Sequence, residues 1–218
     1  MFLITGCPRS GTEFIARVFQ KNGHIVPHEC HAKDLVGVAS WFHLNDLLTK
    51  NNLTKEWRPG WARTPHPDPT NKRFFKRYDY DVVVHQIREP IATISSFFAL
   101  HGSTKKFFRQ WLKPYRSKKE LTGDLQMFMF FWLEWNRVAE KYSQYSYCVE
   151  DLDAIRFDLS QALGLSTTLE TVNLVSKKTN SRKHRTLTAK DFIAANSSLA
   201  NDIFSYYNSF SVSGGAHE

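Results

Sequence analysis

Residues 1–20, MFLITGCPRSGTEFIARVFQ, decide the fold of this chain. The apolar run at 2–5 predicts a buried strand, and the spacing of the apolar residues over 12–21 predicts an amphipathic helix. A loop bounded by two glycines, GCPRSGT (6–12), joins them. Backbone N–H groups at the start of a helix that follows such a loop commonly bind a phosphate. The opening of the chain therefore predicts an anion-binding loop.

This loop differs from two known phosphate-binding signatures. The ATPase and GTPase loop ends in Gly-Lys-Ser/Thr, whereas here Gly11 is followed by Thr12 and Glu13. A cysteine phosphatase needs an arginine six residues after its cysteine, and the residue six positions after Cys7 is Glu13. We therefore expect a phosphate ligand other than ATP or GTP, and no cysteine phosphatase chemistry.

The rest of the sequence alternates between strand and helix patterns, which predicts an α/β fold. We expect one domain over 1–210, an irregular insertion at 51–80, and a flexible tail at 211–218. The aromatic face of the longest predicted helix is expected to be core. The further strands are predicted near 24–27 and over 81–87 and 145–149, and the further helices over 34–49, from Pro90, over 123–142 and 151–165, and near 188–207.

Composition limits the class of protein. The 218 residues include 42% hydrophobic and 14% aromatic residues, typical of a globular protein. The net charge of +8 is concentrated at 72–77 and 177–185 and favours a polyanionic ligand. No nucleic-acid-binding motif accompanies it, so no nucleic-acid partner is expected.

Several features favour a cytoplasmic location. The apolar runs are far shorter than the roughly 20 residues of a membrane span, and a strand starting at residue 2 leaves no room for a signal peptide. Three scattered cysteines, Cys7, Cys30 and Cys148, do not form a disulfide framework.

A second candidate anion site follows the strand predicted at 81–87. Arg88 comes where this strand ends, Pro90 begins a helix, and Ser96 lies two turns further on. Ligands of α/β sheets gather at the carboxyl ends of the strands, so Arg88 is expected near the loop at 6–12. Two anion sites at one edge predict a ligand with two separated phosphates.

These two motifs together resemble the sulfotransferase superfamily that uses 3′-phosphoadenosine 5′-phosphosulfate (PAPS). PRSGT (8–12) resembles the loop for the 5′-phosphosulfate, and Arg88 and Ser96 have the eight-residue spacing of the family's 3′-phosphate site. Weaker similarities lie in HE (28–29), found in bacterial members, and in VEDL (149–152). The resemblance spans residues 2 to about 190.

The resemblance implies a three-layer, P-loop-like fold with a mostly parallel central sheet. It also implies transfer of a sulfuryl group from PAPS to a hydroxyl of a glycan or small metabolite, without a metal. Arg9 would stabilise the leaving phosphate oxygen and Glu29 would act as general base. A late basic loop would close over the nucleotide. The implied donor-binding residues are Pro8, Arg9, Ser10, Gly11, Thr12, Glu13, Arg88, Ser96, Arg182 and Arg185.

The sequence leaves open alternatives for the general base, for the late donor-binding arginine and for the function. Glu13, His28 and His31 are rival bases, and the choice between Arg182 and Arg185 stays open. A zinc site in HECH (28–31) lacks a second ligand cluster. The competing functions are a P-loop kinase of small metabolites and a non-catalytic nucleotide- or nucleic-acid-binding module. The acceptor and the oligomeric state are not determined by the sequence.

Overall fold

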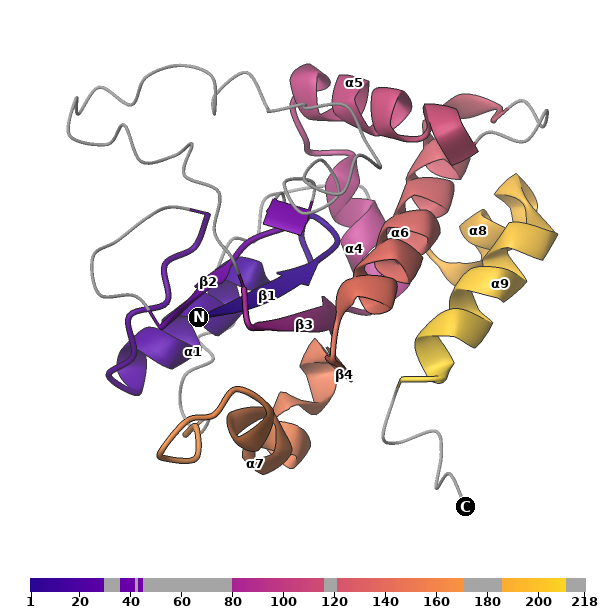
Figure 1. Ribbon diagram of the computed structural model, residues 1–218. Helices are drawn as coiled ribbons and strands as arrows, with labels where there is room; N and C mark the ends of the chain where they lie inside the picture. The colour runs from indigo at the N-terminus through magenta and orange to yellow at the C-terminus, as the bar shows by residue number, and fades with distance from the viewer. Residues whose placement is uncertain (30–35, 42, 45–79, 116–120, 171–185, 211–218) are drawn as a thin grey trace.

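The computed structural model describes residues 1–29, 36–41, 43–44, 80–115, 121–170 and 186–210 (Figure 1). Within these residues the chain has an α/β fold, in which helices pack on both faces of a four-stranded, all-parallel sheet. The expected α/β class, with a parallel sheet flanked by helices, is confirmed. Most of the expected insertion at 51–80 and the whole tail at 211–218 lie outside the described residues.

The strands follow the order β2-β1-β3-β4 across the sheet. They are β1 (Phe2–Gly6), β2 (Gly37–Ala39), β3 (Val82–Ile87) and β4 (Tyr145–Cys148). The helices are α1 (Thr12–Lys21), α4 (Pro90–Phe97), α5 (Gly102–Trp111), α6 (Gly123–Tyr142), α7 (Leu152–Ala162), α8 (Ala189–Ala195) and α9 (Ser197–Asn208). Short 3₁₀ turns form at Lys113–Tyr115 and Val149–Asp151.

The helix expected over 34–49 is wrong at residues 37–39, whereas residues 43 and 44 are helical. Residues 37–39 form β2, and Val38 pairs in register with Leu3 of β1. Three residues carry too little periodicity to distinguish a strand from a helix, so pairing with β1 decides their conformation. Residues 45–49 lie outside the described residues.

The strand expected near 24–27 is also wrong, although the chain runs beside the sheet there. Residues 25–29 lie along β2 with one isolated bridge, His28 to Ala39. Three backbone bonds support this contact, including one from the N–H of Ala39 to the carbonyl of Pro27. Pro27 has no N–H to extend the ladder, which limits regular pairing at this edge.

Two further differences concern helices. The last helix is divided, because Asn196 is extended and its side chain accepts a hydrogen bond from the N–H of Leu199 at the start of α9. Helix α5, residues 102–111, was not expected. The other expected helices and the strands at 2–5, 81–87 and 145–149 are confirmed to within a few residues.

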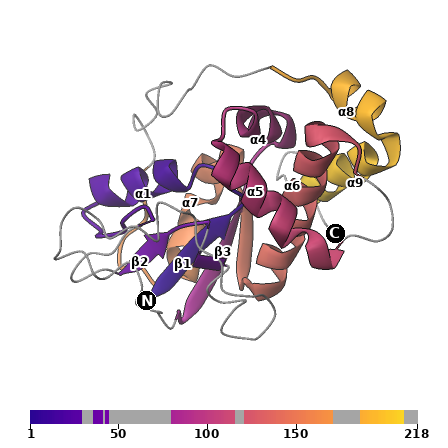
Figure 2. The same ribbon diagram turned by 90° about the horizontal axis from the view of Figure 1, so that it is seen from above.

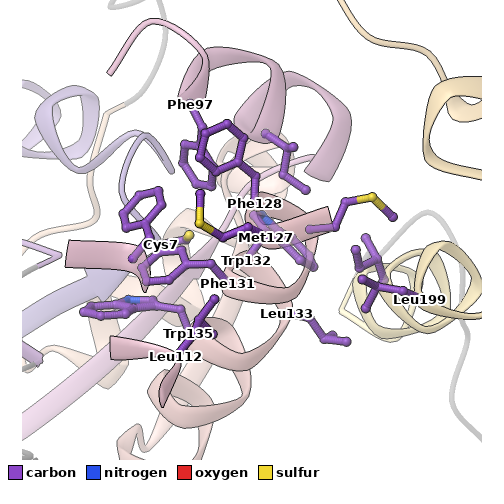
Figure 3. Packing of buried hydrophobic residues seen from close by; sticks show 14 of the residues in the cluster. Cys7, Phe97, Leu112, Met127, Phe128, Phe131, Trp132, Leu133, Trp135 and Leu199 are labelled. Atoms are coloured by element: carbon purple, nitrogen blue, oxygen red, sulfur yellow. The ribbon is translucent and has the colours of Figure 1, made fainter. Parts of the chain in front are cut away.

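Each face of the sheet buries its own apolar cluster. Helices α1 and α7 cover one face, and α4, α5, α6, α8 and α9 pack against the cluster of the other (Figures 1 and 2). The aromatic side chains of α6 form the centre of the second cluster, as expected from the sequence (Figure 3). Phe128, Trp132 and Trp135 are fully buried there.

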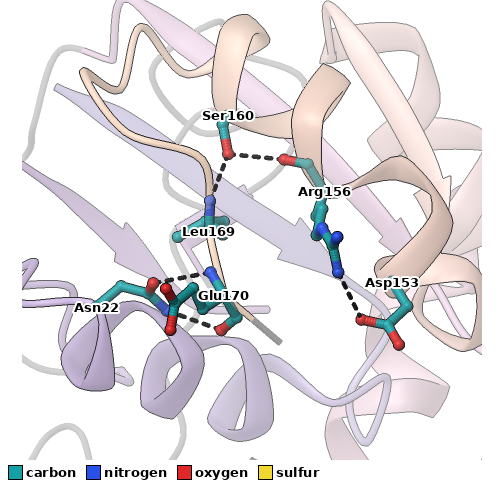
Figure 4. A network of polar contacts seen from close by, with 6 residues as sticks. All are labelled: Asn22, Asp153, Arg156, Ser160, Leu169 and Glu170. Atoms are coloured by element: carbon teal, nitrogen blue, oxygen red, sulfur yellow. Dashed lines mark hydrogen bonds and ion pairs between the residues drawn. The ribbon is translucent and has the colours of Figure 1, made fainter. Parts of the chain in front are cut away.

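The end of α1 is fixed to the segment that follows α7 (Figure 4). Asn22 donates to the carbonyl of Glu170 at 3.0 Å and accepts from its N–H at 2.8 Å. Ser160 of α7 accepts from the N–H of Leu169 at 3.0 Å. These contacts hold α1 and α7 together on one face.

None of the helices in the described ranges is both long and apolar enough to cross a bilayer.

Candidate active site

The topology brings the two sequence motifs together. β1 and β3 are adjacent parallel strands, and the helices that follow them lie on opposite faces of the sheet: α1 on one face and α4 on the other. Such a switch point, at the carboxyl ends of the strands, is where α/β sheets bind ligands. The loop after β1 and Arg88 after β3 both lie at this edge.

The loop at 6–12 has two left-handed residues, a pattern found in the anion-binding concavities called nests. Arg9 and Gly11 have positive φ angles of 71° and 94°, whereas Ser10 between them does not. Alternation between left- and right-handed residues gathers successive N–H groups into a concave donor site for an anion. Gly11 is also the N-cap of α1, and no side chain within the described residues caps this helix. The positive end of the α1 dipole therefore adds to the site.

Side chains from elsewhere in the fold hold the carbonyl groups of this loop. Trp135 of α6 donates to the Gly6 carbonyl at 2.9 Å, and Arg88 donates to the Arg9 carbonyl at 3.1 Å. Gln86 of β3 donates to the Ser10 carbonyl at 2.6 Å and accepts from the hydroxyl of Tyr147 at 2.5 Å. Within the loop the N–H of Ser10 donates to the Cys7 carbonyl at 3.0 Å, so a ligand would bind through the remaining N–H groups of the loop and of the start of α1.

Two hydroxyl groups lie in or beside the nest. Within the described part of the chain, the buried Ser10 Oγ has no hydrogen-bond partner. Such an orphaned polar atom is costly unless a ligand or water satisfies it. Thr12 Oγ1 lies 3.1 Å from Nε2 of His28. Burial lowers the pKa of His28, so its ring is neutral at pH 7 and can donate to Thr12.

Glu29 follows His28 in the chain, and its carboxylate lies 3.5 Å from Nε2 of His28. Its N–H donates to the Ala39 carbonyl at 3.0 Å, and its side chain is 18% exposed. Burial, reinforced by the negative charge of Glu13, raises the pKa of Glu29 from 4.5 to about 7. A hydrogen bond from Trp41 and the charge of Arg9 oppose this rise. A carboxylate with a pKa near 7 is suited to accept a proton at neutral pH.

Backbone strain singles out two residues. Across the described ranges, Arg9 and Glu29 are the only non-glycine residues with positive φ, at 71° and 55°. This conformation costs free energy for a side chain with a Cβ and persists at sites where geometry matters for function. These are the two residues that the sequence analysis proposed for catalysis.

The other expected site residues differ in their surroundings. Arg88 reaches the loop itself, through the Arg9 carbonyl. The buried Ser96 hydroxyl donates back to the Thr93 carbonyl of its own helix at 2.6 Å, so binding a phosphate would require it to rotate. Glu13 forms an ion pair with Arg17 one turn along α1. Arg182, Arg185, Cys30 and His31 lie outside the described residues.

Three contributors were missed by the sequence analysis. Gln86 was predicted as an ordinary strand residue, and Trp135 was predicted as part of the core only. Trp41 lay in the helix that was expected over 34–49. A polar atom on an otherwise buried side chain was the available signal, because an indole N–H or an amide in the core needs a partner.

The fold and the site together define an α/β protein whose loop at 6–12 lies at the carboxyl edge of the sheet, close to the Glu29 carboxyl group of raised pKa. No protein-family model, curated protein or solved structure gives a significant match to the chain.

Proposed function

We propose that this chain is a sulfotransferase that moves a sulfuryl group from PAPS to a hydroxyl acceptor. The main support is that two residues on separate segments have strained backbones at this site: Arg9 within the proposed anion-binding loop and Glu29 beside it. The family resemblance of the two motifs supplies the identity of the donor. The P-loop-like character of the fold belongs to the same proposal.

The donor would bind through both anion sites. The nest of Arg9 and Gly11 and the start of α1 suit the 5′-phosphosulfate, and the buried Ser10 hydroxyl would join them after rotating away from Gly6. Arg88 would use its remaining N–H groups on the 3′-phosphate while one N–H stays on the Arg9 carbonyl. Arg9 would stabilise the charge that develops on the leaving phosphate oxygen.

The transfer itself would be an in-line substitution at sulfur. Glu29 takes the proton of the acceptor hydroxyl, the acceptor oxygen forms its bond to sulfur, and the bond between sulfur and the 5′-phosphate oxygen breaks. The products are the sulfate ester, adenosine 3′,5′-bisphosphate, and a protonated Glu29 that returns its proton to solvent. The acceptor is a glycan or a small metabolite in this proposal.

Ligand-induced thermal shifts separate this function from its rivals. A ligand bound only by the folded state raises its melting temperature, so adenosine 3′,5′-bisphosphate should stabilise the chain far more than Mg·ATP does. Stabilisation by Mg·ATP alone would favour the kinase. Transfer of radiolabelled sulfate from PAPS to a panel of hydroxyl acceptors then tests catalysis directly.

Replacing Arg88 by alanine should weaken adenosine 3′,5′-bisphosphate by on the order of 2 kcal/mol, because a charge-assisted contact to the 3′-phosphate is lost. AMP should lose much less, through the loosened Arg9 carbonyl alone. Isothermal titration with both ligands measures the difference. If both lose equally, Arg88 only supports the loop.

We also expect transfer without a divalent cation. The loop lacks the ATPase lysine, and β3 runs directly into Arg88 rather than into a carboxylate that could bind Mg²⁺. Activity measured in EDTA should match activity in Mg²⁺. Inactivation by EDTA that Mg²⁺ reverses would contradict the proposal and favour the kinase.

A further inference from the structure

We propose that Trp41 is a positioning residue for Glu29, and that its contact with Trp135 fixes this carboxylate relative to the anion-binding loop. The inference rests on the proposed role of Glu29 and adds the residues that hold it in place. It concerns two tryptophans that the resemblance did not assign to the site.

The contacts form a continuous path across the site. The indole of Trp41 donates a hydrogen bond to the carboxylate of Glu29. Its ring meets that of Trp135 edge to face, with centroids 5.8 Å apart, and the indole of Trp135 donates to the Gly6 carbonyl at 2.9 Å. Phe107 packs against both rings, at 5.7 and 5.9 Å. Both indoles are buried, with Trp41 7% and Trp135 0% exposed.

The chemistry of an indole suits this task. Its N–H is a donor that neither ionises nor accepts, so it can hold the carboxylate oxygen both before and after proton transfer. Among the described residues, the charged and titratable groups around Glu29 are Arg9 from the loop, Glu13 from α1 and the adjacent His28. Trp41 is a donor that does not titrate, and it favours the ionised carboxylate without adding a charge beside the anionic PAPS.

The aromatic contact gives the path its stiffness. Packed aromatic rings occupy few rotamers and resist displacement, because the interior is close-packed. One indole binds the carboxylate and the other binds the first carbonyl of the loop, so their contact connects the base to the phosphate site, in addition to the contact between Thr12 and His28. Misplacement by about 1 Å can cost roughly 10²-fold in rate.

The sharpest test replaces the tryptophan with 3-benzothienylalanine, which has the same shape with sulfur in place of the N–H. At position 41 we expect the pKa of Glu29, followed by carboxyl ¹³C NMR, to rise. The acidic limb of the kcat profile should move to higher pH, and turnover at pH 6 should fall roughly tenfold or more, the effect of losing a hydrogen bond to a charged group. Affinity for adenosine 3′,5′-bisphosphate should not change.

The same replacement at position 135 is the matched control. It removes the bond to the Gly6 carbonyl, so bisphosphate affinity should fall while the pKa of Glu29 stays near its parent value. Trp41→Phe provides a second variant without the donor and should move the pKa in the same direction.

An unchanged pKa of Glu29 in both position 41 variants would overturn the inference. The NMR titration requires neither donor nor acceptor, so it is independent of the proposed function. A parent protein without sulfuryl transfer would refute that function, whereas transfer with an unmoved pKa would refute the role of Trp41 alone.

Discussion

Replacing Glu29 by glutamine is expected to lower turnover roughly 10²–10⁴-fold, the usual contribution of a positioned general base. The amide keeps the shape of the side chain, and its oxygen can still accept from Trp41. The loss should therefore fall on kcat, while the affinity for adenosine 3′,5′-bisphosphate stays close to that of the parent. Single-turnover kinetics and calorimetric titration measure the two quantities.

The kcat of the unmodified protein should depend on pH through the ionisation of Glu29. Only the ionised carboxylate accepts a proton, and its pKa is about 7, so kcat should fall as the pH drops below 7. This acidic limb should disappear in the glutamine variant. Glu13→Gln is the matched control, because Glu13 is the rival base in the first turn of α1 and pairs with Arg17. Near-parent turnover in Glu29→Gln would remove Glu29 from the mechanism and leave Glu13 as the residue to test.

Glu29→Gln should lower turnover but raise the stability of the folded protein at neutral and alkaline pH. The carboxyl has a pKa of about 7 in the folded chain against an ordinary 4.5, so the folded state binds the proton more tightly. Its contribution is favourable below pH 4.5 and is lost as the pH rises to 7. Glu29→Gln removes this loss and should stabilise the fold above pH 7 by on the order of a few kcal/mol, at about 1.4 kcal/mol per pKa unit. Melting temperatures of both proteins at pH 5 and pH 8 test this sign.

Replacing Gly6 by alanine should destabilise the fold by at least about 3 kcal/mol. A Cβ at this position would lie 2.1 Å from the carbonyl oxygen of Gln86 and 2.6 Å from Ser10 Oγ. Gly6 pairs with Gln86 in the sheet and receives the bond from Trp135, so the Gln86 carbonyl cannot move away without disturbing these contacts. Urea denaturation measures the loss of unfolding free energy.

Gly102 provides the matched control for this substitution. It begins α5, and a Cβ added there would meet no atom of the described residues outside its own helix within 4 Å. Alanine there should be neutral or slightly stabilising, since alanine favours a helix over glycine by up to about 1 kcal/mol. If Gly6→Ala and Gly102→Ala unfold at the same urea concentration, the close approach of β1 and β3 at Gly6 is not a constraint on the fold.

The sequence predicts the parts of the structure that depend on local pattern. The β1 strand, the glycine-bounded loop and α1 follow from apolar spacing and loop chemistry, and so does the long helix α6. β2 could not be predicted in this way, because three residues take their conformation from pairing with β1. The division at Asn196 depends on a cap that the apolar pattern does not contain.

The candidate site was predictable to a similar extent. Arg9, Arg88 and Glu29 were proposed from motifs, and the structure brings the first two into contact. The groups that hold the loop were not predictable, since Gln86 and Trp135 reach it from residues far away in the chain. An apolar pattern identifies a tryptophan as core and does not indicate what its N–H binds.

The bonds that fix the anion-binding loop also have a consequence for how the protein folds. The loop precedes its partners in the chain, because its carbonyl groups are bonded by side chains 76, 79 and 129 residues further along. Closing chain segments of that length costs entropy and slows folding. The loop therefore reaches its final conformation only after α6 has emerged from the ribosome.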